Sequence, residues 1–506
     1  MKNGWILLLA AGLAAVSCSK GDSGYYRDYM NGKSYESPNA EYANAPEDGG
    51  EAEAPEDPSS GDQFDAIIEN PFVSTAENPV SSFSVDADGA SYAYMRRCVL
   101  AGMQVPANSV RIEEYLNYFT FDYAEPKEGE TLAINADVAS CPWASGHLLL
   151  RLGLKGKSLK DNEIPAANYI LLIDTSGSMS GDDRIDLVKT GLCSMVDYMR
   201  PEDRIAIITY SGSVKKVLES TLVSQGANTI KNAIRGLQAS GSTAGGEAMK
   251  MAYEEASAHY ITGGNNRIIM CTDGDFNVGV SSTDALVQMV ESYQEKGIYL
   301  SIMGFGMGNF QDSRMESLSN HGNGTYTYID SEEEMMKVFV NERSHFWAVA
   351  NDTKCQVRFN PETVAQYRLI GYENRTMTAE EFEDSKKDAG EIGAGQTVTA
   401  LYEIIPAPGF NPEESGAVAT FEARYKFSLK DAESRSLTEV VSPTCIVDEN
   451  MLFAAGVAAY GLVLRGSEYK GDATLKMARD LVDGARSFDP NGFRAQLVGL
   501  MDKQMK

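Results

Sequence analysis

The sequence predicts an α/β protein: a doubly wound, mostly parallel sheet that is inserted in or flanked by a β-sandwich-like domain, with helical segments at both ends. Two observations predict this class. Over residues 166–346, apolar strand-like runs alternate regularly with helical runs, which is typical of a parallel sheet covered by helices. On either side of that region the runs are β-branched and punctuated by glycine, which favours antiparallel strands.

Length, composition and charge limit the possible classes of protein. The chain has 506 residues, which is more than a single hydrophobic core usually serves, so several domains are expected. Hydrophobic residues make up 43% and charged residues 23%, as in ordinary globular proteins. The formal net charge is -28, and because that charge repels phosphates, nucleic acid is not an expected partner.

The first 18 residues have the pattern of an export signal. Lys2 precedes an apolar run over residues 5–16, which is too short to span a bilayer. Ser17 and Cys18 follow, and this resembles a lipoprotein signal peptide after whose removal Cys18 is acylated, although Ala15 stands where leucine is more usual. An ordinary secretory signal with an incidental cysteine is the alternative.

The segment that follows supports a lipid anchor. Residues 19–62 are acidic and contain several prolines, so they cannot bury enough apolar surface to fold and are predicted to form a disordered tether. We therefore expect the protein to be attached by its lipid to a membrane in the cell envelope of a Gram-negative bacterium, at the outer membrane on its periplasmic or surface face.

Six further cysteines are widely spaced and form no C-x-x-C motif, so neither a zinc ribbon nor a redox pair is indicated. No disulfide pairing is predicted from the spacing alone. These residues are Cys98, Cys141, Cys193, Cys271, Cys355 and Cys445.

An N-terminal helical module is predicted over residues 63–130. Its two helices are expected at 90–100 and 109–119, with Ser109 as the N-cap of the second. Asp86 and Asp88 precede the first helix, but Ala90 occupies the next alternate position, so an EF-hand loop is excluded and a helix cap is expected instead.

A β segment over residues 131–165 and a β-rich domain over residues 347–445 surround the α/β domain. We expect the strands of the first to pair with those of the second, so that the α/β domain is inserted in a β-sandwich. A helical segment over residues 446–506 ends the chain. The strands outside the α/β domain are predicted at 131–138, 147–155, 355–359, 367–372, 396–405 and 417–429, and the last helices at 449–465, 472–487 and 492–501.

Within the α/β domain, continuously apolar strands indicate a sheet that is covered on both faces. Strands are predicted at 169–173, 204–210, 214–219, 267–272, 298–304 and 325–329. Helices are predicted at 184–199, 229–237, 244–260, 283–296, 311–320 and 332–343.

Carboxylates and hydroxyls follow three of these elements. Asp174, Ser176 and Ser178 form a D-x-S-x-S turn after the first strand, Asp273 follows the fourth strand, and Thr243 precedes a helix. If the first and fourth strands flank the point where strand order reverses, the two aspartates face each other across it. An oxygen-only donor set suits Mg²⁺ rather than metals that prefer histidine or thiolate.

This set resembles the metal-ion-dependent adhesion site (MIDAS) of von Willebrand factor type A (VWA) domains, and residues 83–94 and 367–375 resemble the flanking regions of bacterial proteins with such domains. The resemblance implies a bound Mg²⁺, or Mn²⁺ or Ca²⁺. It also implies metal contacts from the hydroxyls of Ser176, Ser178 and Thr243, and from Asp174 and Asp273 directly or through water. A protein ligand would fill the open position with an Asp or Glu carboxylate.

Two alternatives accompany this interpretation of the cluster. The D-x-S-x-S turn could be a capped turn without metal. The neighbouring acids Asp182, Asp183 and Asp275 are expected to cap helices or face solvent, and Asp275 would at most support a ligand.

The sequence predicts binding rather than catalysis. Ser176 stands where an aspartyl-phosphate enzyme would need a second carboxylate, and the four histidines form no HExxH motif. We therefore predict an exported, membrane-anchored protein that captures a protein ligand through the metal site. Two other functions stay open: a structural scaffold of an envelope complex in which the metal only stabilises loops, and a chelatase-like partner of an ATPase.

Overall fold

The computed structural model divides the chain into two units, Met1–Glu56 and Asp57–Lys506, and every described residue belongs to the second. The expected signal peptide, Cys18 and residues 19–61 of the expected tether therefore lie outside the described residues. Described are residues 62, 64–160, 162–241, 245–274, 283–306, 312–384, 387, 389–412, 414, 416–443 and 447–506.

The α/β domain contains a six-stranded sheet in the order β10-β9-β8-β5-β6-β7. All neighbours are parallel except β7, which is antiparallel to β6 at one edge. Strand order reverses between β5 and β8, as a doubly wound sheet requires. The strands are β5 (Ala167–Asp174), β6 (Arg204–Tyr210), β7 (Val214–Leu222), β8 (Asn265–Thr272), β9 (Ile298–Phe305) and β10 (Tyr326–Ile329).

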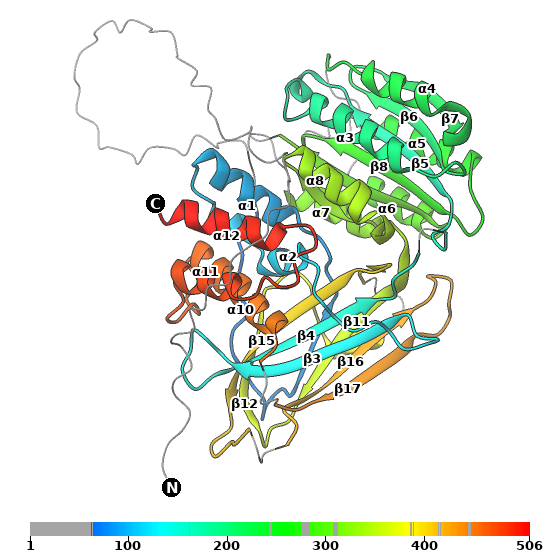
Figure 1. The fold of residues 1–506 in the computed structure, drawn as a ribbon. Coiled ribbons are helices and arrows are strands. Elements are labelled where there is room, and N and C mark those ends of the chain that lie inside the picture. The colour runs from blue at the N-terminus through cyan, green and yellow to red at the C-terminus, as the bar shows by residue number, and fades with distance from the viewer. Residues whose placement is uncertain are drawn as a thin grey trace, which may run out of the picture. The chain divides into compact units, whose positions relative to one another are not determined.

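Helices lie on both faces of this sheet (Figure 1). Because successive strand side chains point to opposite faces, Ile170 and Leu172 pack in one hydrophobic cluster with α5, α6 and α7, while Leu171 and Ile173 pack in another with α3, α4 and α8. The predicted fold class is thereby confirmed. The helices are α3 (Ile185–Tyr198), α4 (Val223–Arg235), α5 (Gly245–Ala258), α6 (Thr283–Gln294), α7 (Asp312–His321) and α8 (Glu332–Met336).

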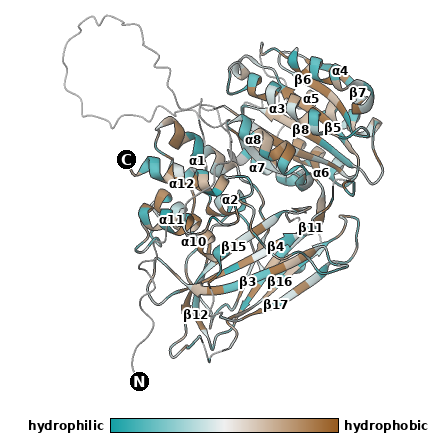
Figure 2. Ribbon diagram, viewed as in Figure 1, coloured by the Kyte–Doolittle hydropathy of each residue, from teal (hydrophilic) through white to brown (hydrophobic). Residues whose placement is uncertain are grey.

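Two of these helices differ by more than two residues at one end from their predicted extents, and the others differ by one or two residues. The helix predicted at 332–343 ends at Met336 and continues as a π-helical turn, Lys337–Asn341, and a 3-10 turn, Arg343–Phe346. The helix predicted at 229–237 begins earlier, at Val223, and contains a non-helical Gly226. Figure 2 shows that α4 is largely hydrophilic whereas β6 and β8 are hydrophobic, because α4 covers the domain and the strands are buried.

Two antiparallel sheets make up the β-rich region, in the orders β1-β12-β15-β4-β3 and β13-β2-β11-β16-β17, with β14 beside β11. Their facing side chains share one hydrophobic cluster, for example Leu152 of one sheet and Val357 of the other, so the region is a sandwich. The strands are β1 (Val73–Ser74), β2 (Val80–Ser84), β3 (Leu132–Ser140), β4 (Leu148–Gly156), β11 (Ala348–Phe359), β12 (Val364–Ile370), β13 (Thr376–Met377), β14 (Ile392–Gly393), β15 (Thr397–Pro406), β16 (Ala419–Lys426) and β17 (Arg435–Val441).

The α/β domain is inserted in this sandwich. Strand β4, which precedes the domain, pairs with β15, which follows it, in a register running from Leu148 opposite Ile404 to Lys155 opposite Thr397. The strand pairing that we expected from the sequence is therefore present.

The terminal helices form a third group, and here residues 63–130 differ from the helical module that we predicted. Their β2 joins the sandwich beside β11, and their helices pack on those of the C-terminus: the rings of Phe119 and Phe453 lie 4.9 Å apart. A single helix cannot bury its own apolar face, so these helices cover one another. They are α1 (Ala90–Ala101), α2 (Ile112–Asn117), α10 (Glu449–Arg465), α11 (Leu475–Asp483) and α12 (Phe493–Gln504).

Two expected helix caps are wrong. Ser109 ends a separate 3-10 turn, and α2 begins after Arg111 without a side-chain cap. Helix α1 begins after Gly89, also without a side-chain cap. Asp86 instead accepts from the amide of Asp88 and pairs with Arg375, and Asp88 accepts from the amide of Tyr326. Neither carboxylate therefore caps the helix as the sequence indicated.

The described cysteines, residues 98, 141, 193, 271 and 355, are all free, and Cys445 lies outside the described residues. Burial raises the pKa of the Cys271 thiol to about 12, so this side chain behaves as a small apolar group within β8. Across the part of the chain that the structure describes, no helix has the length and apolar character needed to cross a bilayer.

Gly324, just before β10, offers a test of how tightly the sheet is packed. A Cβ atom there would lie 1.8 Å from the backbone oxygen of Leu300, so Gly324→Ala is expected to lower the free energy of unfolding by about 2 kcal/mol. At Gly499 in α12 a Cβ meets nothing within 4 Å, and Gly499→Ala should be neutral or slightly stabilising. Thermal unfolding checks the pair, and equal midpoints for the two variants would contradict the packing argument.

Candidate metal centre

Two carboxylates meet at the carboxyl ends of β5 and β8. The two strands are parallel neighbours with Ile173 opposite Cys271, so Asp174 ends β5 at the level where β8 ends, and Asp273 follows one residue later. Asp174 is 0% exposed and Asp273 is 3% exposed. The crevice between these strand ends is the reversal point at which doubly wound sheets bind ligands.

The turn after β5 brings two hydroxyls to the same crevice. The amide of Ser176 donates to Oδ1 of Asp174 at 2.8 Å, which closes the turn over the carboxylate. The Ser176 and Ser178 hydroxyl oxygens lie 2.9 Å apart. Ser176 is buried, as the two aspartates are, whereas Ser178 is exposed.

A third segment is hydrogen-bonded to this turn. The amide of Ser240 donates to the carbonyl of Thr175 at 2.7 Å, and the amide of Gly177 donates to the carbonyl of Gly241 at 3.0 Å. Gly241 has a φ of +95°, a left-handed conformation that favours glycine. Thr243, the fifth residue predicted for the site, lies outside the described residues, but the chain before it is thus attached to the turn.

The electrostatics of the crevice favour a cation. Burial, together with the nearby charge of Asp273, raises the pKa of Asp174 to about 6, although hydrogen bonds from the amide and hydroxyl of Ser176 and the hydroxyl of Tyr210 oppose the shift. Thr272 also donates to Asp174, at 3.4 Å. These hydrogen-bond donors carry no charge, so they stabilise the ionised form of Asp174 only in part. A bound cation would offset the remaining cost of ionising this buried carboxylate.

The donor set fits a hard divalent ion. It consists of carboxylate and hydroxyl oxygens, which Mg²⁺, Mn²⁺ and Ca²⁺ prefer, and contains no imidazole or thiolate. Within the described ranges no group of three or more His, Cys, Asp or Glu side chains is placed to hold a metal. A site here therefore depends on serine and threonine hydroxyls as well as on the two aspartates.

The other loop acids do not share this role. Both oxygens of the Asp183 carboxylate are engaged, Oδ2 by Arg97 and Oδ1 by Arg184 at 3.1 Å, so Asp183 neither caps a helix nor extends freely into solvent as expected. Asp182 is exposed, as predicted, and Asp275 lies outside the described residues. Arg97 was not singled out from the sequence because nothing near it in the chain indicates a contact with a loop 86 residues away.

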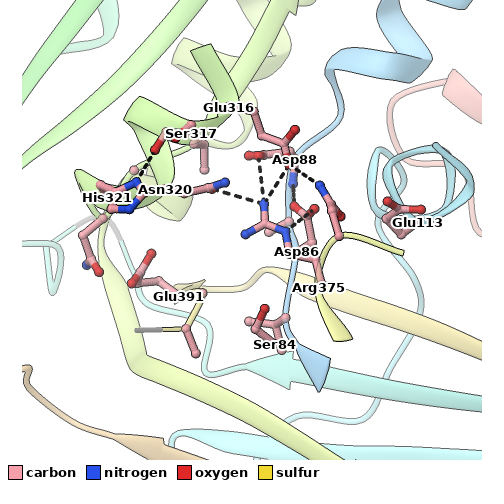
Figure 3. A pocket seen from close by; sticks show the side chains of 18 of the residues that line it. Ser84, Asp86, Asp88, Glu113, Glu316, Ser317, Asn320, His321, Arg375 and Glu391 are labelled. Atoms are coloured by element: carbon pink, nitrogen blue, oxygen red, sulfur yellow. Dashed lines mark hydrogen bonds and ion pairs between the residues drawn. The ribbon is translucent and has the colours of Figure 1, made fainter. Parts of the chain in front are cut away.

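A cavity of about 860 Å³ lies at the other ends of the strands, near the amino ends of β8 and β10. Figure 3 shows its central feature, the Arg375 guanidinium surrounded by carboxylates. The Nε atom of Arg375 lies 3.1 Å from Oδ2 of Asp86, and Nη2 lies 3.3 Å from Oε1 of Glu316 and 3.8 Å from Oδ2 of Asp88. This cluster joins the segment before α1, helix α7 and the turn after β12.

Family models match three parts of the chain. Residues 169–275 match the model described as von Willebrand factor type A domain, a span that includes both aspartates of the crevice. Residues 58–151 match one described as von Willebrand factor, and residues 344–506 match one described as the C-terminal region of uncharacterized protein YfbK.

The chain is also similar to whole proteins and to solved structures. "Uncharacterized protein YfbK" of Escherichia coli (strain K12) is 37% identical over 465 residues, which cover 87% of this chain and 80% of the relative. Inter-alpha-trypsin inhibitor heavy chain H3 of Homo sapiens is 27% identical over 176 residues, 33% of this chain and 20% of the relative. The solved "von Willebrand factor type A from Catenulispora acidiphila" is 13% identical with a TM-score of 0.40, and the match covers 73% of this chain and 89% of that one.

Proposed function

Because this chain belongs to the family of Escherichia coli YfbK and carries a von Willebrand factor type A domain, we propose that it captures a protein ligand through a divalent-metal site. The site consists of Asp174, Ser176, Ser178, Thr243 and Asp273. The observation that carries the proposal is the convergence of two buried carboxylates and a pair of serine hydroxyls at the reversal point of the sheet.

Each residue has a distinct part in this proposal. Asp174 and Asp273 supply the negative charge that balances the ion. The hydroxyls of Ser176, Ser178 and Thr243 supply further oxygen ligands. When bound, Mg²⁺, Mn²⁺ or Ca²⁺ supplies an open coordination position for a carboxylate oxygen of the partner. The exposure of Ser178 supports a position that is accessible to a macromolecular ligand.

We propose a binding role and no catalysis. The histidines contact groups away from the crevice: His147 contacts Glu403, His259 contacts Arg204, His321 contacts the carbonyl of Ser317, and His345 lies near Glu342. General acid–base chemistry by histidine is therefore not supported beside Asp174.

We also propose that the protein is exported and held at the membrane through a lipid on Cys18. The supporting feature is the signal-like sequence before Cys18, followed by an acidic segment that can act as a tether. This places the metal site in the cell envelope, where a partner protein would meet it.

Metal titration of the full chain tests the proposal. Wild type is expected to bind one divalent ion, and Asp174→Ala is expected to weaken that affinity by at least about 100-fold, since even residues that only support a ligand typically account for about 10–100-fold. Isothermal titration calorimetry with Mg²⁺, Mn²⁺ and Ca²⁺ gives the affinities. Asp182→Ala is the matched control, because Asp182 is an exposed acid of the same loop, and it should bind like wild type.

Two results of the titration would contradict the proposal. Absence of binding by the wild type, or equal binding by Asp174→Ala, would overturn the metal site. Ser176→Ala distinguishes ligand capture from a purely structural metal: loss of chelator-sensitive ligand capture supports the proposal, whereas a lower melting temperature with unchanged capture contradicts it.

A further inference from the structure

Helix α1, which lies outside the α/β domain in sequence, reaches the loop beside the proposed metal site. The rings of Tyr94 in α1 and Tyr328 in β10 lie 5.7 Å apart, and Nη1 of Arg97 donates to the Tyr328 hydroxyl at 2.8 Å. The Nη2 atom of Arg97 forms an ion pair with Oδ2 of Asp183. One side chain of the flanking region therefore contacts two separate elements of the α/β domain.

Asp183 belongs to the short loop over residues 180–184, between the D-x-S-x-S turn and α3. This loop is tightly built: Gly181 has a φ of +142°, and a Cβ atom there would lie 3.2 Å from Oδ1 of Asp183. The amides of Arg184 and Asp186 both donate to the carbonyl of Gly181 at 3.3 Å. The amide of Ser180 donates to the carbonyl of Gly177 at 3.2 Å, so hydrogen bonds connect this loop with the turn that contains Ser178.

Tyr328 extends the contact to a second loop at the same edge of the sheet. Its hydroxyl donates to the carbonyl of Gly306 at 2.6 Å, directly after β9. Gly306 has a φ of +74°, and a Cβ atom there would lie 2.2 Å from Nε of Arg184. Arg97, Tyr328, Gly306 and Arg184 thus connect α1 with the loops that follow β5 and β9.

Arg96, the residue before Arg97, also attaches α1 to the α/β domain. The attachment of this helix therefore does not depend on Arg97 alone. Arg96 is 2% exposed and forms ion pairs with Asp330 and with Glu334, the latter at 2.6 Å, which anchors the helix to the end of β10 and to α8. The side chain of Arg97 is 20% exposed and is directed to the metal-site loop. In addition, Arg97 and Arg184 both contact the Asp183 carboxylate, so this side chain links the two arginines.

We propose that Arg97 is a positioning residue of the metal site, through which helix α1 sets the affinity of the type A domain for its cation and for an acidic protein ligand. The inference rests on the proposed function, since it concerns the same site. By holding the Asp183 carboxylate, Arg97 keeps the 180–184 loop, and with it the Ser176 and Ser178 hydroxyls, in the arrangement that receives the ion.

A double-mutant cycle in the full chain tests this role with Mn²⁺ as the probe. Arg97→Gln and Asp183→Asn are each expected to weaken Mn²⁺ affinity on the order of tenfold. The loss in the double variant should be smaller than the sum of the two single losses, since both single variants remove the Arg97–Asp183 contact. Arg97→Lys should recover part of the affinity, because lysine retains the charge but not the forked geometry.

Arg479 of α11 provides the matched control, because it is 26% exposed and pairs with Asp483 at 2.8 Å and Asp502 at 2.9 Å. Arg479→Gln should leave Mn²⁺ affinity unchanged. Wild-type affinity in Arg97→Gln, or additive losses in the double variant, would overturn the positioning role while leaving the metal site intact. Absence of Mn²⁺ binding by the wild type would overturn the metal site and this inference together. Should Arg97→Gln fail to fold, Asp183→Asn measures the same contact.

Discussion

Arg375→Ala is expected to lower the free energy of unfolding by about 3–5 kcal/mol, the range found when one partner of a buried ion pair is removed. Arg375 faces Asp86, Asp88 and Glu316, which are 3%, 4% and 5% exposed. Without the guanidinium, these acids keep their burial. Asp86 and Asp88 lose their ion pairs with Arg375, whereas Glu316 keeps its ion pair with Arg111. Because they come from separate segments, the loss also loosens the junction between the α/β domain and its flanks.

Urea unfolding followed by tryptophan fluorescence measures this effect. Arg424→Ala is the control: Arg424 pairs with Glu383 at 2.7 Å, but Glu383 is 66% exposed, and a surface pair contributes at most about 1 kcal/mol. Adding Asp86→Asn to Arg375→Ala should recover part of the loss, since it removes a buried carboxylate that has lost its ion pair with Arg375. A loss of less than about 1 kcal/mol for Arg375→Ala would show that the cluster is not what joins these segments.

Glu113→Gln is expected to stabilise the protein in a pH-dependent way. Burial, followed by the nearby charge of Glu373, raises the pKa of Glu113 from 4.5 to about 7, although Arg465 opposes the shift. A carboxyl whose pKa is higher in the folded state contributes stability that is complete below pH 4.5 and is lost as pH rises through 7. The difference corresponds to about 3 kcal/mol at pH 8.

Glutamine keeps the shape of the side chain but carries no charge, so the variant avoids this loss. Thermal unfolding at pH 4.5, 6 and 8 should show a difference from wild type that is near zero at the lowest pH and grows as pH rises. Glu128 is exposed, and Glu128→Gln should show a constant difference. A pH-independent difference for Glu113→Gln would mean that the folded protein does not hold this carboxyl protonated near neutral pH.

Features determined by neighbouring residues were predicted well. The apolar run of α10 gave its bounds, Glu449–Arg465, without error, because a helix that is apolar on most faces and flanked by Asp448 and Gly466 has unambiguous ends. The alternation of strands and helices predicted the doubly wound sheet, since it reflects burial on two faces. Ser109 failed as a cap because a hydroxyl can also bond within its own turn, here to the carbonyl of Pro106.

The strand ends that carry Asp174, Ser176, Ser178 and Asp273 could be located from local sequence, because parallel strands bring such residues to one edge whatever surrounds the sheet. The environment of these residues could not be predicted from local sequence. The pair Arg97 and Asp183 is separated by 86 residues, and Arg375 and Asp86 by 289. Charges so far apart leave no periodic or motif signal in the chain. Only the packing of α1 and of the sandwich against the α/β domain decides which of them pair and how deeply they are buried.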